Sequence, residues 1–324
     1  MPEAVHVEEI PSPVLEQGQV RVRVHVAAVN FPDVLLVANS YQVSVPTPFV
    51  PGSEFAGTVA EVADNAGDVA VGDRVFGSTM VGAFAEEVAV AAHAVCRIPS
   101  GVDDRTAAAF GVSHRTAYHV LRSVAKLRPK EEVVVLGAGG GVGLAAVQLA
   151  AVLGASVTAV ASTKEKLDAA RACGAGRLVD HRSGDLRRLL RHALPDGADV
   201  VVDPVGGELA EPALRVLRWG GRFVTVGYAS GVVPRIPLNL VLLKGIHILG
   251  FQFRDFAVHA PDELERNEHE LMELLSLHKA APHIGAVFDL SEASAALCHV
   301  ADGRSIGKVV VLVGPELPMG AVRK

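Results

Sequence analysis

The chain has 324 residues, half of them hydrophobic but only 5% aromatic, and its formal net charge is −6. This length allows two domains with sizeable cores, and the composition indicates cores of valine, alanine and leucine. The negative net charge and the lack of a cluster of basic residues disfavour nucleic acid or an anionic membrane as a partner. No apolar run reaches the length of a membrane span, and no secretory signal opens the chain. Because Cys96, Cys173 and Cys298 lie far apart and form no Cys-x-x-Cys motif, we expect a cytoplasmic protein.

The N-terminal third of the chain predicts a β-rich domain. Residues 20–26 alternate valine with Arg21, Arg23 and His25, which predicts a half-exposed strand. Further short strands are predicted at residues 57–62, 74–76 and 86–91, with Gly/Asp turns between them, which favours a small barrel or sandwich. Residues 30–57 are punctuated by prolines and cannot form one long helix. That segment is either a loop that carries site residues or a plain surface connection.

Residues 106–124 predict a helix, after which strands and helices alternate to about residue 250. The predicted strands are residues 133–136, 157–160, 200–202, 222–226 and 246–250, and the predicted helices are residues 143–153, 164–173, 186–192 and 208–217. This alternation predicts a parallel, doubly wound sheet.

Beyond residue 255 the pattern predicts helices at residues 261–279 and 291–302 and a strand at residues 308–313. These elements are too few to form a domain, so we expect them to complete the first one. The resulting division is one domain from residues 1–112 and 256–324, and a second from residues 113–255.

A glycine cluster follows the buried strand predicted at residues 133–136. Reading G-x-G-x-x-G forward from Gly137 fails because Val142 occupies the third glycine position. Reading backward from Gly143 gives Ala138-x-Gly140-x-x-Gly143, in which Gly140 would admit a pyrophosphate and Gly143 would let helix and strand pack closely. The phosphates would then bind the free N–H groups of the helix N-terminus. The alternative is a glycine-rich turn that binds nothing.

The next predicted strand indicates which dinucleotide is bound. An NAD site usually has a carboxylate at the tip of this strand, whereas here the chain reads Ser162-Thr163-Lys164-Glu165-Lys166. A hydroxyl and two lysines suit a 2′-phosphate, which favours NADPH over NADH. The alternative is a helix capped by Ser162 or Thr163 and followed by solvated lysines.

Several motifs together resemble one family over nearly the whole chain. They are NFPDVLL, YQV…PFVPGSEFAG, TAYHVL, GGVGLAAVQLA, ASTKEKL, GGRFVTVG and GRSIGKVVV. The chain is similar in these motifs to the zinc-free quinone oxidoreductase (ζ-crystallin-like) branch of the medium-chain dehydrogenase/reductase superfamily. The resemblance implies an α/β protein with a GroES-like β-rich catalytic domain, made from both chain ends, and a Rossmann NADPH-binding domain inserted between them.

Zinc members of that superfamily carry a cysteine and a Gly-His-Glu motif as metal ligands. The corresponding stretches here read Asn30-Phe31-Pro32-Asp33 and Gly52-Ser53-Glu54, and the family's four-cysteine zinc lobe is missing. Since zinc sites need three or four thiolate, imidazole or carboxylate ligands, we expect a zinc-independent protein without a metal site.

The resemblance also implies the site residues. Asn30 and Tyr41 would lie beside the nicotinamide, where Tyr41 is the better donor to a developing oxyanion, or else an aromatic that only packs in its loop. Ser162 and Lys166 would meet the 2′-phosphate and His181 the adenosine. The other cofactor-binding residues implied are Thr116, Gly140, Gly141, Val142, Gly143, Val226, Gly227, Phe251, Phe253 and Arg304.

Three features depart from the family pattern. His114-Arg115 replaces a Tyr-Gly pair and would either admit an acidic substrate or face solvent. Gln252 and Arg254 replace apolar or small residues, which leaves the substrate's shape open. The chain also begins later than its relatives, so a first strand is expected to be missing or the start site misassigned.

The expected reaction is hydride transfer from NADPH to a quinone or another activated carbonyl or alkene, held in an interdomain cleft. The alternatives are an NADPH-dependent reductase of enoyl thioesters or enones, and a non-catalytic NADPH-binding structural or RNA-associated protein. The resemblance further implies a homodimer formed through the strand at residues 246–250, since an open apolar edge needs covering.

Overall fold

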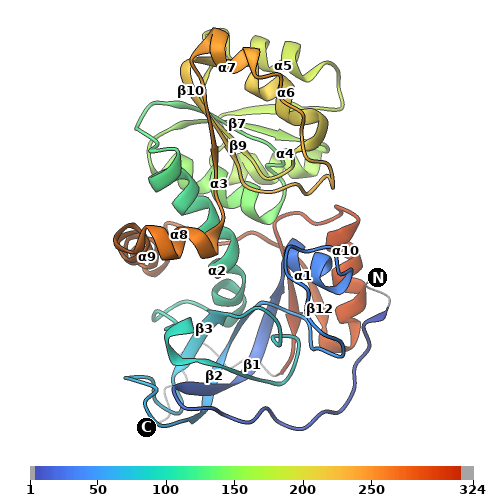
Figure 1. Cartoon of the computed structure of the whole chain (residues 1–324), viewed down its shortest axis with the longest axis vertical. Coiled ribbons are helices and arrows are strands. Elements are labelled where there is room, and N and C mark those ends of the chain that lie inside the picture. Colours follow the sequence, from blue (N-terminus) through green and yellow to red (C-terminus); the bar gives the residue numbers. More distant parts are fainter. Residues whose placement is uncertain (1–3, 315–324) are drawn as a thin grey trace. The chain divides into compact units, whose positions relative to one another are not determined.

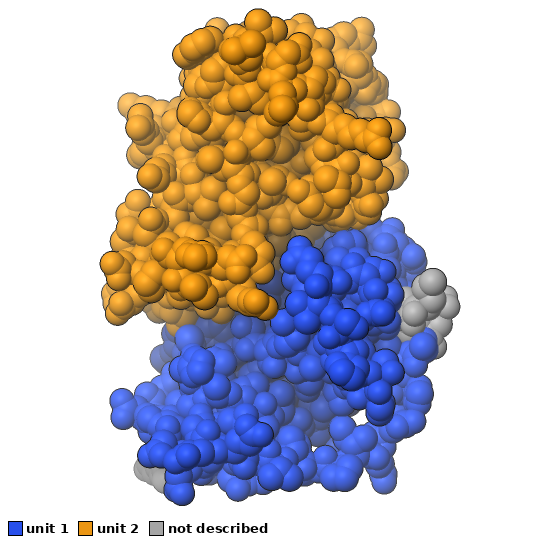
Figure 2. Space-filling model, in the orientation of Figure 1, with its two compact units in different colours: residues 1–112, 284–324 blue, residues 113–283 orange. Residues whose placement is uncertain are grey.

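The computed structural model describes residues 4–314 of the chain. It divides into two compact units, one formed by Met1–Val112 with Ile284–Lys324 and the other by Ser113–His283 (Figure 2). Helix α2 (Asp104–His119) carries the chain from the first unit into the second. No helix within residues 4–314 is long and apolar enough to cross a membrane.

Unit 1 is built on a seven-stranded sheet of order β12-β13-β1-β2-β3-β5, with β4 also paired to β1. Its strands β1, β2, β3 and β12 are labelled in Figure 1. The strands are β1 (Gln19–Val29), β2 (Glu54–Val62), β3 (Arg74–Ser78), β4 (Glu87–Ala91), β5 (Val95–Arg97), β12 (Ile284–Asp289) and β13 (Lys308–Leu312). The inward valines of β1 are buried and Arg23 between them is exposed, as the alternation predicted. The prediction is wrong for His25, which is also buried, with its Nδ1 2.8 Å from Asp104 Oδ2. Because β13 pairs antiparallel with β1, the C-terminal segment completes the first unit.

Helices α1 (Phe31–Val37) and α10 (Ala293–Ala301) belong to unit 1 and contact each other. The prolines of residues 30–57 predict an irregular segment, and α1 within it was not predicted. Pro32 lies in the first turn of α1, where a proline costs no helical hydrogen bond, so it does not prevent the helix. Helix α10 begins two residues after Ser291, and a 3₁₀ turn capped by Asp289 precedes it.

Unit 2 contains a six-stranded sheet of order β11-β10-β9-β6-β7-β8 in which every pair is parallel. The strands are β6 (Glu132–Val135), β7 (Ser156–Ala161), β8 (Arg177–Asp180), β9 (Ala198–Asp203), β10 (Leu217–Thr225) and β11 (His247–Gly250). The helices along the sheet are α3 (Gly141–Val152), α4 (Lys164–Ala172), α5 (Leu186–Ala193), α6 (Ala210–Leu214) and α7 (Asn239–Lys244). The predicted combination of a β-rich unit, completed by the C-terminal strands, and a parallel Rossmann-like sheet is confirmed.

Strand β8 was not predicted, and the helix predicted over residues 208–217 is too long, because α6 ends at Leu214 and β10 begins at Leu217. Helix α8 (Phe253–His259) was also not predicted. Helix α9 (Pro261–Ser276) belongs to unit 2, because Asn267 and Glu268 bond to His119 of α2. The compact units therefore divide after residue 283, whereas the sequence analysis placed that boundary after residue 255.

Candidate active site

The turn between β6 and α3 fits close packing of strand and helix. Gly140 is the N-cap of α3, and Gly141 and Val142 form its first turn. A Cβ atom on Gly143 would lie 2.1 Å from the carbonyl oxygen of Gly137, so no larger residue fits there without moving the backbone. A Cβ atom on Gly140 would meet nothing closer than 3.6 Å. The turn therefore presents backbone N–H groups at the start of a twelve-residue helix, a geometry suited to phosphate.

The residues at the tip of β7 divide between capping and binding roles. Thr163 is the N-cap of α4 and its side chain accepts the N–H of Lys166 at 3.3 Å. Lys164 is exposed and pairs with Asp168 at 2.5 Å, so it matches the solvated alternative. Lys166 contradicts the alternative of a solvated lysine, because it is half-buried. Its aliphatic carbons lie against the glycine turn, 2.5 Å from where a Cβ atom on Gly139 would be. Ser162 is half-buried beside them.

Basic groups gather at the ends of β7 and β8. Burial lowers the pKa of Lys166, and the neighbouring Arg182 guanidinium lowers it further. Burial likewise lowers the pKa of His181, with Arg182 and Lys166 acting in the same direction and the Asp180 carboxylate opposing them. Lys166 and Arg182 are thus close enough for their charges to repel, next to the His181 imidazole, and binding a dianion such as a 2′-phosphate would relieve that repulsion. Lys166 and His181 were predicted as site residues from the sequence, whereas Arg182, which directly follows His181, was not.

The ends of β9 and β10 are joined through Asp203, which is fully buried. Its Oδ1 accepts the N–H groups of Val205 and Gly206 at 2.9 and 2.8 Å, and its backbone oxygen accepts the N–H of Val226 at 2.8 Å. Burial raises the pKa of this carboxyl. Since the N–H of Val226 is used in this way, Val226 has only its carbonyl to offer a ligand, while Gly227 follows it half-buried.

The aromatic residues predicted to meet the cofactor surround His119 of α2. The rings of Phe251 and His119 stack with centroids 6.1 Å apart, and the ring of Phe253 lies 5.6 Å from the same imidazole. The Arg115 guanidinium lies 4.5 Å from the Phe253 ring centroid and donates to Glu268 at 2.8 Å. Thr116, which follows Arg115 in α2, is half-buried.

The structure answers the question raised by His114 and Arg115. His114 is 2% exposed and its Nε2 lies 3.1 Å from the Gln148 amide oxygen, so the solvent-facing alternative is wrong for it. The charge of Arg115 is already paired with Glu268 inside unit 2. Both residues therefore serve the packing of α2 against α3 and α9, and neither is placed as an unpaired cation for an acidic substrate.

A buried polar network surrounds Asn30 in unit 1. The Asn30 amide nitrogen donates to Glu54 Oε2 at 3.0 Å, and its oxygen accepts Lys308 Nζ at 2.6 Å. Lys308 also donates to the same Glu54 oxygen at 2.9 Å, and Glu54 Oε1 accepts the N–H of Val112 at 2.6 Å. All three side chains are at most 7% exposed. The Asn30 amide is thus fixed by a buried ion pair that the sequence analysis did not identify.

The remaining predicted residues lie at the margins of unit 1. Tyr41 is half-buried in the irregular segment that follows α1. Arg304 is exposed after α10 and pairs with Asp302 at 2.9 Å. Within residues 4–314 no group of three or more His, Cys, Asp or Glu side chains is arranged to hold a metal ion. The roles of Tyr41 and Arg304 and the lack of zinc remain predictions.

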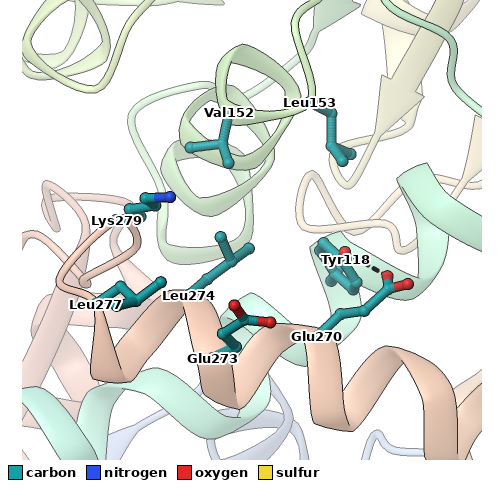
Figure 3. Close-up of a pocket in the computed structure, with 8 residues that line it drawn as sticks. All are labelled: Tyr118, Val152, Leu153, Glu270, Glu273, Leu274, Leu277 and Lys279. Atoms are coloured by element: carbon teal, nitrogen blue, oxygen red, sulfur yellow. Dashed lines mark hydrogen bonds between the residues drawn. The ribbon is translucent and has the colours of Figure 1, made fainter.

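A separate pocket of about 620 Å³ lies in unit 2 between α2, α3 and α9 (Figure 3). Its lining includes Glu270, Glu273 and Lys279, and the Tyr118 hydroxyl donates to Glu270 at 2.7 Å. Two carboxylates against one ammonium give this pocket an unsuitable charge for a phosphate-bearing cofactor, and none of the predicted site residues line it.

Comparison with known proteins agrees with this architecture. Residues 16–100 match the alcohol dehydrogenase GroES-like domain, and residues 141–273 match the domain described as zinc-binding dehydrogenase. The chain is 35% identical to quinone oxidoreductase-like protein 2 of Bos taurus, over 94% of this chain and 88% of that protein. It is 38% identical to a polyketide synthase of Streptomyces halstedii, over 95% of this chain but only 5% of that protein.

Among solved structures, the quinone oxidoreductase of Thermus thermophilus, solved also as its complex with NADPH, is 34% identical and superposes with a TM-score of 0.83. That match covers 94% of this chain and 95% of the other. The chain belongs to the quinone oxidoreductase-like proteins of the medium-chain dehydrogenase/reductase superfamily.

Proposed function

We propose that this protein is an NADPH-dependent oxidoreductase that reduces a quinone or another activated carbonyl or alkene. The observation that carries the proposal is the combination of a glycine turn that admits no side chain at Gly143 with three basic groups at the neighbouring strand ends. A relative that was crystallised with NADPH, the Thermus quinone oxidoreductase, supports the choice of cofactor.

The residues of unit 2 fit this cofactor. The N–H groups of Gly141, Val142 and Gly143 would bind the pyrophosphate, and Lys166 and Arg182 with Ser162 would bind the 2′-phosphate. When bound, the nicotinamide supplies a hydride to the acceptor. We further propose that His181 contacts the adenosine, and that the nicotinamide half is held by Thr116, Val226, Gly227, Phe251, Phe253 and Arg304.

In unit 1, Tyr41 would donate a hydrogen bond to the oxygen on which charge develops. Asn30 is better suited to positioning than to donation, because both ends of its amide are already engaged by Glu54 and Lys308. Its contribution would be to hold Ser53 and the start of α1 in place, with Ser53 Oγ 3.5 Å from the Asn30 amide nitrogen.

The experiment that tests this function follows NADPH oxidation at 340 nm with an ortho-quinone and, in parallel, a short enoyl thioester. Rapid quinone turnover with NADPH and slow turnover with NADH is the expected result. Replacing Lys166 and Arg182 together with glutamine should raise the KM for NADPH by about 10- to 100-fold, the effect of losing charge-assisted bonds worth about 1.5–3 kcal/mol, and leave the KM for NADH unchanged. Lys164→Gln is the matched control, because Lys164 is exposed and paired with Asp168.

A second candidate is reduction of an enoyl thioester or enone, favoured by the likeness to a segment of a polyketide synthase. Turnover of the thioester and not of the quinone would select it. Tight NADPH binding with no turnover of either acceptor would instead indicate the third candidate, a non-catalytic NADPH-binding protein with a structural or RNA-associated role.

We also propose that the protein is a cytoplasmic homodimer formed through the edge of the unit 2 sheet. Strand β11 is an edge strand, and Ile248 on it is 40% exposed. Leu242 and Leu243 of the preceding helix are 80% and 67% exposed, and Trp219 beside Gly245 is 75% exposed. An unpaired edge next to several large exposed apolar side chains is stabilised when a second copy of the chain covers it. No disulfide joins the described cysteines, which agrees with a reducing compartment.

A further inference from the structure

Asp203, at the carboxyl end of β9, holds the loop of residues 204–207 with only one of its two carboxyl oxygens. Its Oδ1 accepts the N–H groups of Val205 and Gly206 at 2.9 and 2.8 Å. Its Oδ2 is buried and has no hydrogen-bond partner in the described part of the chain. Burying an oxygen without a partner costs free energy, so a gain in stability does not explain this carboxyl. A role in placing the loop does.

The loop is held on both sides of Val205. The N–H of Val205 donates to the Asp203 carboxyl, and its backbone oxygen accepts the N–H of Ser230 at 3.0 Å. The base of the loop is fixed as well, because the backbone oxygen of Asp203 accepts the N–H of Val226 at 2.8 Å. Since the peptide groups on either side of Val205 are bonded, the direction of its side chain is set.

The Val205 side chain packs on the glycine turn between β6 and α3. A Cβ atom on Gly137 would lie 2.5 Å from Val205 Cγ2, so this methyl group lies directly against the Cα atom of Gly137. The residues on either side of Gly137 are fixed by the neighbouring strands, because the N–H groups of Leu136 and Ala138 donate to β9 and β7 at 3.0 Å. Gly137 itself is therefore the residue of the turn that Val205 holds in place.

Gly137 in turn supports the start of α3. Its carbonyl oxygen accepts the N–H of Gly140, the N-cap of this helix, at 3.0 Å. The same oxygen lies 2.1 Å from where a Cβ atom on Gly143 would be, so the first turn of α3 packs directly on it. The contacts thus run without interruption from Asp203 through Val205 and Gly137 to the N–H groups proposed for the pyrophosphate, and all of them lie in unit 2.

We propose that Asp203 is a positioning residue for the cofactor, which acts through Val205 and Gly137 on the pyrophosphate-binding N–H groups of α3. The inference rests on the proposed function. The sheet of unit 2 extends outward in both directions from the neighbouring strands β6 and β9. Dinucleotides bind at the carboxyl ends of the strands at such a point, which is where the Asp203 loop and the glycine turn meet. By holding the turn in shape before the cofactor binds, Asp203 lowers the cost of ordering it.

The test compares NADPH binding by wild type, Asp203→Ala, Asp203→Asn and Val205→Ala in a fluorescence titration. Asp203→Ala releases the loop and should raise the dissociation constant for NADPH about 10-fold, the effect of losing one or two hydrogen bonds. Asp203→Asn keeps an oxygen for the two N–H groups and should bind NADPH like wild type. Asp289→Ala is the matched control, because Asp289 also caps a turn with its side chain but lies in unit 1, outside the proposed site.

Three further readouts separate positioning from a general loss of fold. Saturating NADPH should restore kcat for the quinone in Asp203→Ala, so that only the KM for NADPH changes. The amide of Gly140 should exchange its hydrogen faster in Asp203→Ala and Val205→Ala, with the amides of β8 unchanged. Because both substitutions act on one path, the double variant should bind NADPH no more weakly than Asp203→Ala alone.

Each contrary outcome is recognisable. Wild-type affinity in Asp203→Ala overturns the proposal, as does an Asp203→Asn variant that is impaired as much as Asp203→Ala. Additive losses in the double variant overturn the path through Val205. If Asp203→Ala does not fold, Val205→Ala decides, because it keeps every backbone hydrogen bond of the loop, and unchanged NADPH affinity and Gly140 exchange in it overturn the proposal. Wild-type protein that binds no NADPH refutes the proposed function, and this is seen without any variant.

Discussion

Replacing Asp33 with asparagine should make unit 1 more stable at neutral pH and leave its stability near pH 4 unchanged. In the folded chain the pKa of Asp33 is raised from 3.8 to about 6. The folded state therefore binds the proton of Asp33 more tightly than the unfolded state does. The contribution of this proton to the stability of the fold is complete below pH 3.8 and is lost as the pH rises to about 6. A shift of about 2 units corresponds to about 3 kcal/mol. Asparagine keeps an oxygen for the N–H of Asn30 and never ionises, so the variant avoids that loss.

Hydrogen exchange of the amides in β1 and β13 is the suitable assay, because the single tryptophan of the chain, Trp219, lies in unit 2. The ratio of exchange rates between wild type and Asp33→Asn at each pH cancels the intrinsic pH dependence of exchange. That ratio should be near one at pH 4 and should rise to on the order of 10² at pH 7, with wild type exchanging faster. A ratio that stays constant between these values, or a variant that exchanges faster at pH 7, would contradict the conclusion that Asp33, 1% exposed in the first turn of α1, ionises only near pH 6.

Three further predictions follow from the packing of single residues. Gly143→Ala should raise the dissociation constant for NADPH by at least tenfold in a fluorescence titration, because its Cβ would lie 2.1 Å from Gly137 O. Gly176→Ala is the control, because its Cβ would meet nothing closer than Val157 O at 3.9 Å and Gly176 lies outside the proposed site. Tyr41→Phe should lower kcat for the quinone by about 10-fold or more with NADPH affinity unchanged, and equal turnover would remove Tyr41 from the mechanism. Leu242→Glu should convert a dimer into a monomer in light scattering at micromolar concentration, and a monomeric wild type would refute the dimer itself.

The sequence was sufficient for features that depend on local patterns. Runs of valine such as Val133 to Val135 predicted strands buried on both faces, and the glycines after them predicted the turn into α3. The pattern failed for a short element. The prolines of residues 30–57 exclude one long helix there, but Pro32 lies in the first turn of the seven-residue helix α1, where proline is tolerated, and this helix was not predicted.

The sequence could not predict contacts that depend on tertiary pairing. Lys308 lies 254 positions from Glu54, and only the pairing of β13 with β1 brings its ammonium to the start of β2. The same holds for Arg115, whose partner Glu268 lies on α9. The sequence alone does not show whether an arginine pairs with a ligand or with a distant carboxylate. Arg115 could therefore be interpreted as a substrate contact.

The network around Asn30 also gives a physical reason to expect no zinc. The positions where zinc members have ligands hold Asn30 and Ser53, and the ends of the Asn30 and Glu54 side chains are taken by Lys308. A Zn²⁺ ion there would place two positive charges beside a buried ammonium and would find too few ligands. Prolonged dialysis against a chelator should therefore leave NADPH oxidation and thermal stability unchanged. A loss that added Zn²⁺ restores would mean that the ion displaces Lys308, and that this ion pair is not what occupies the site.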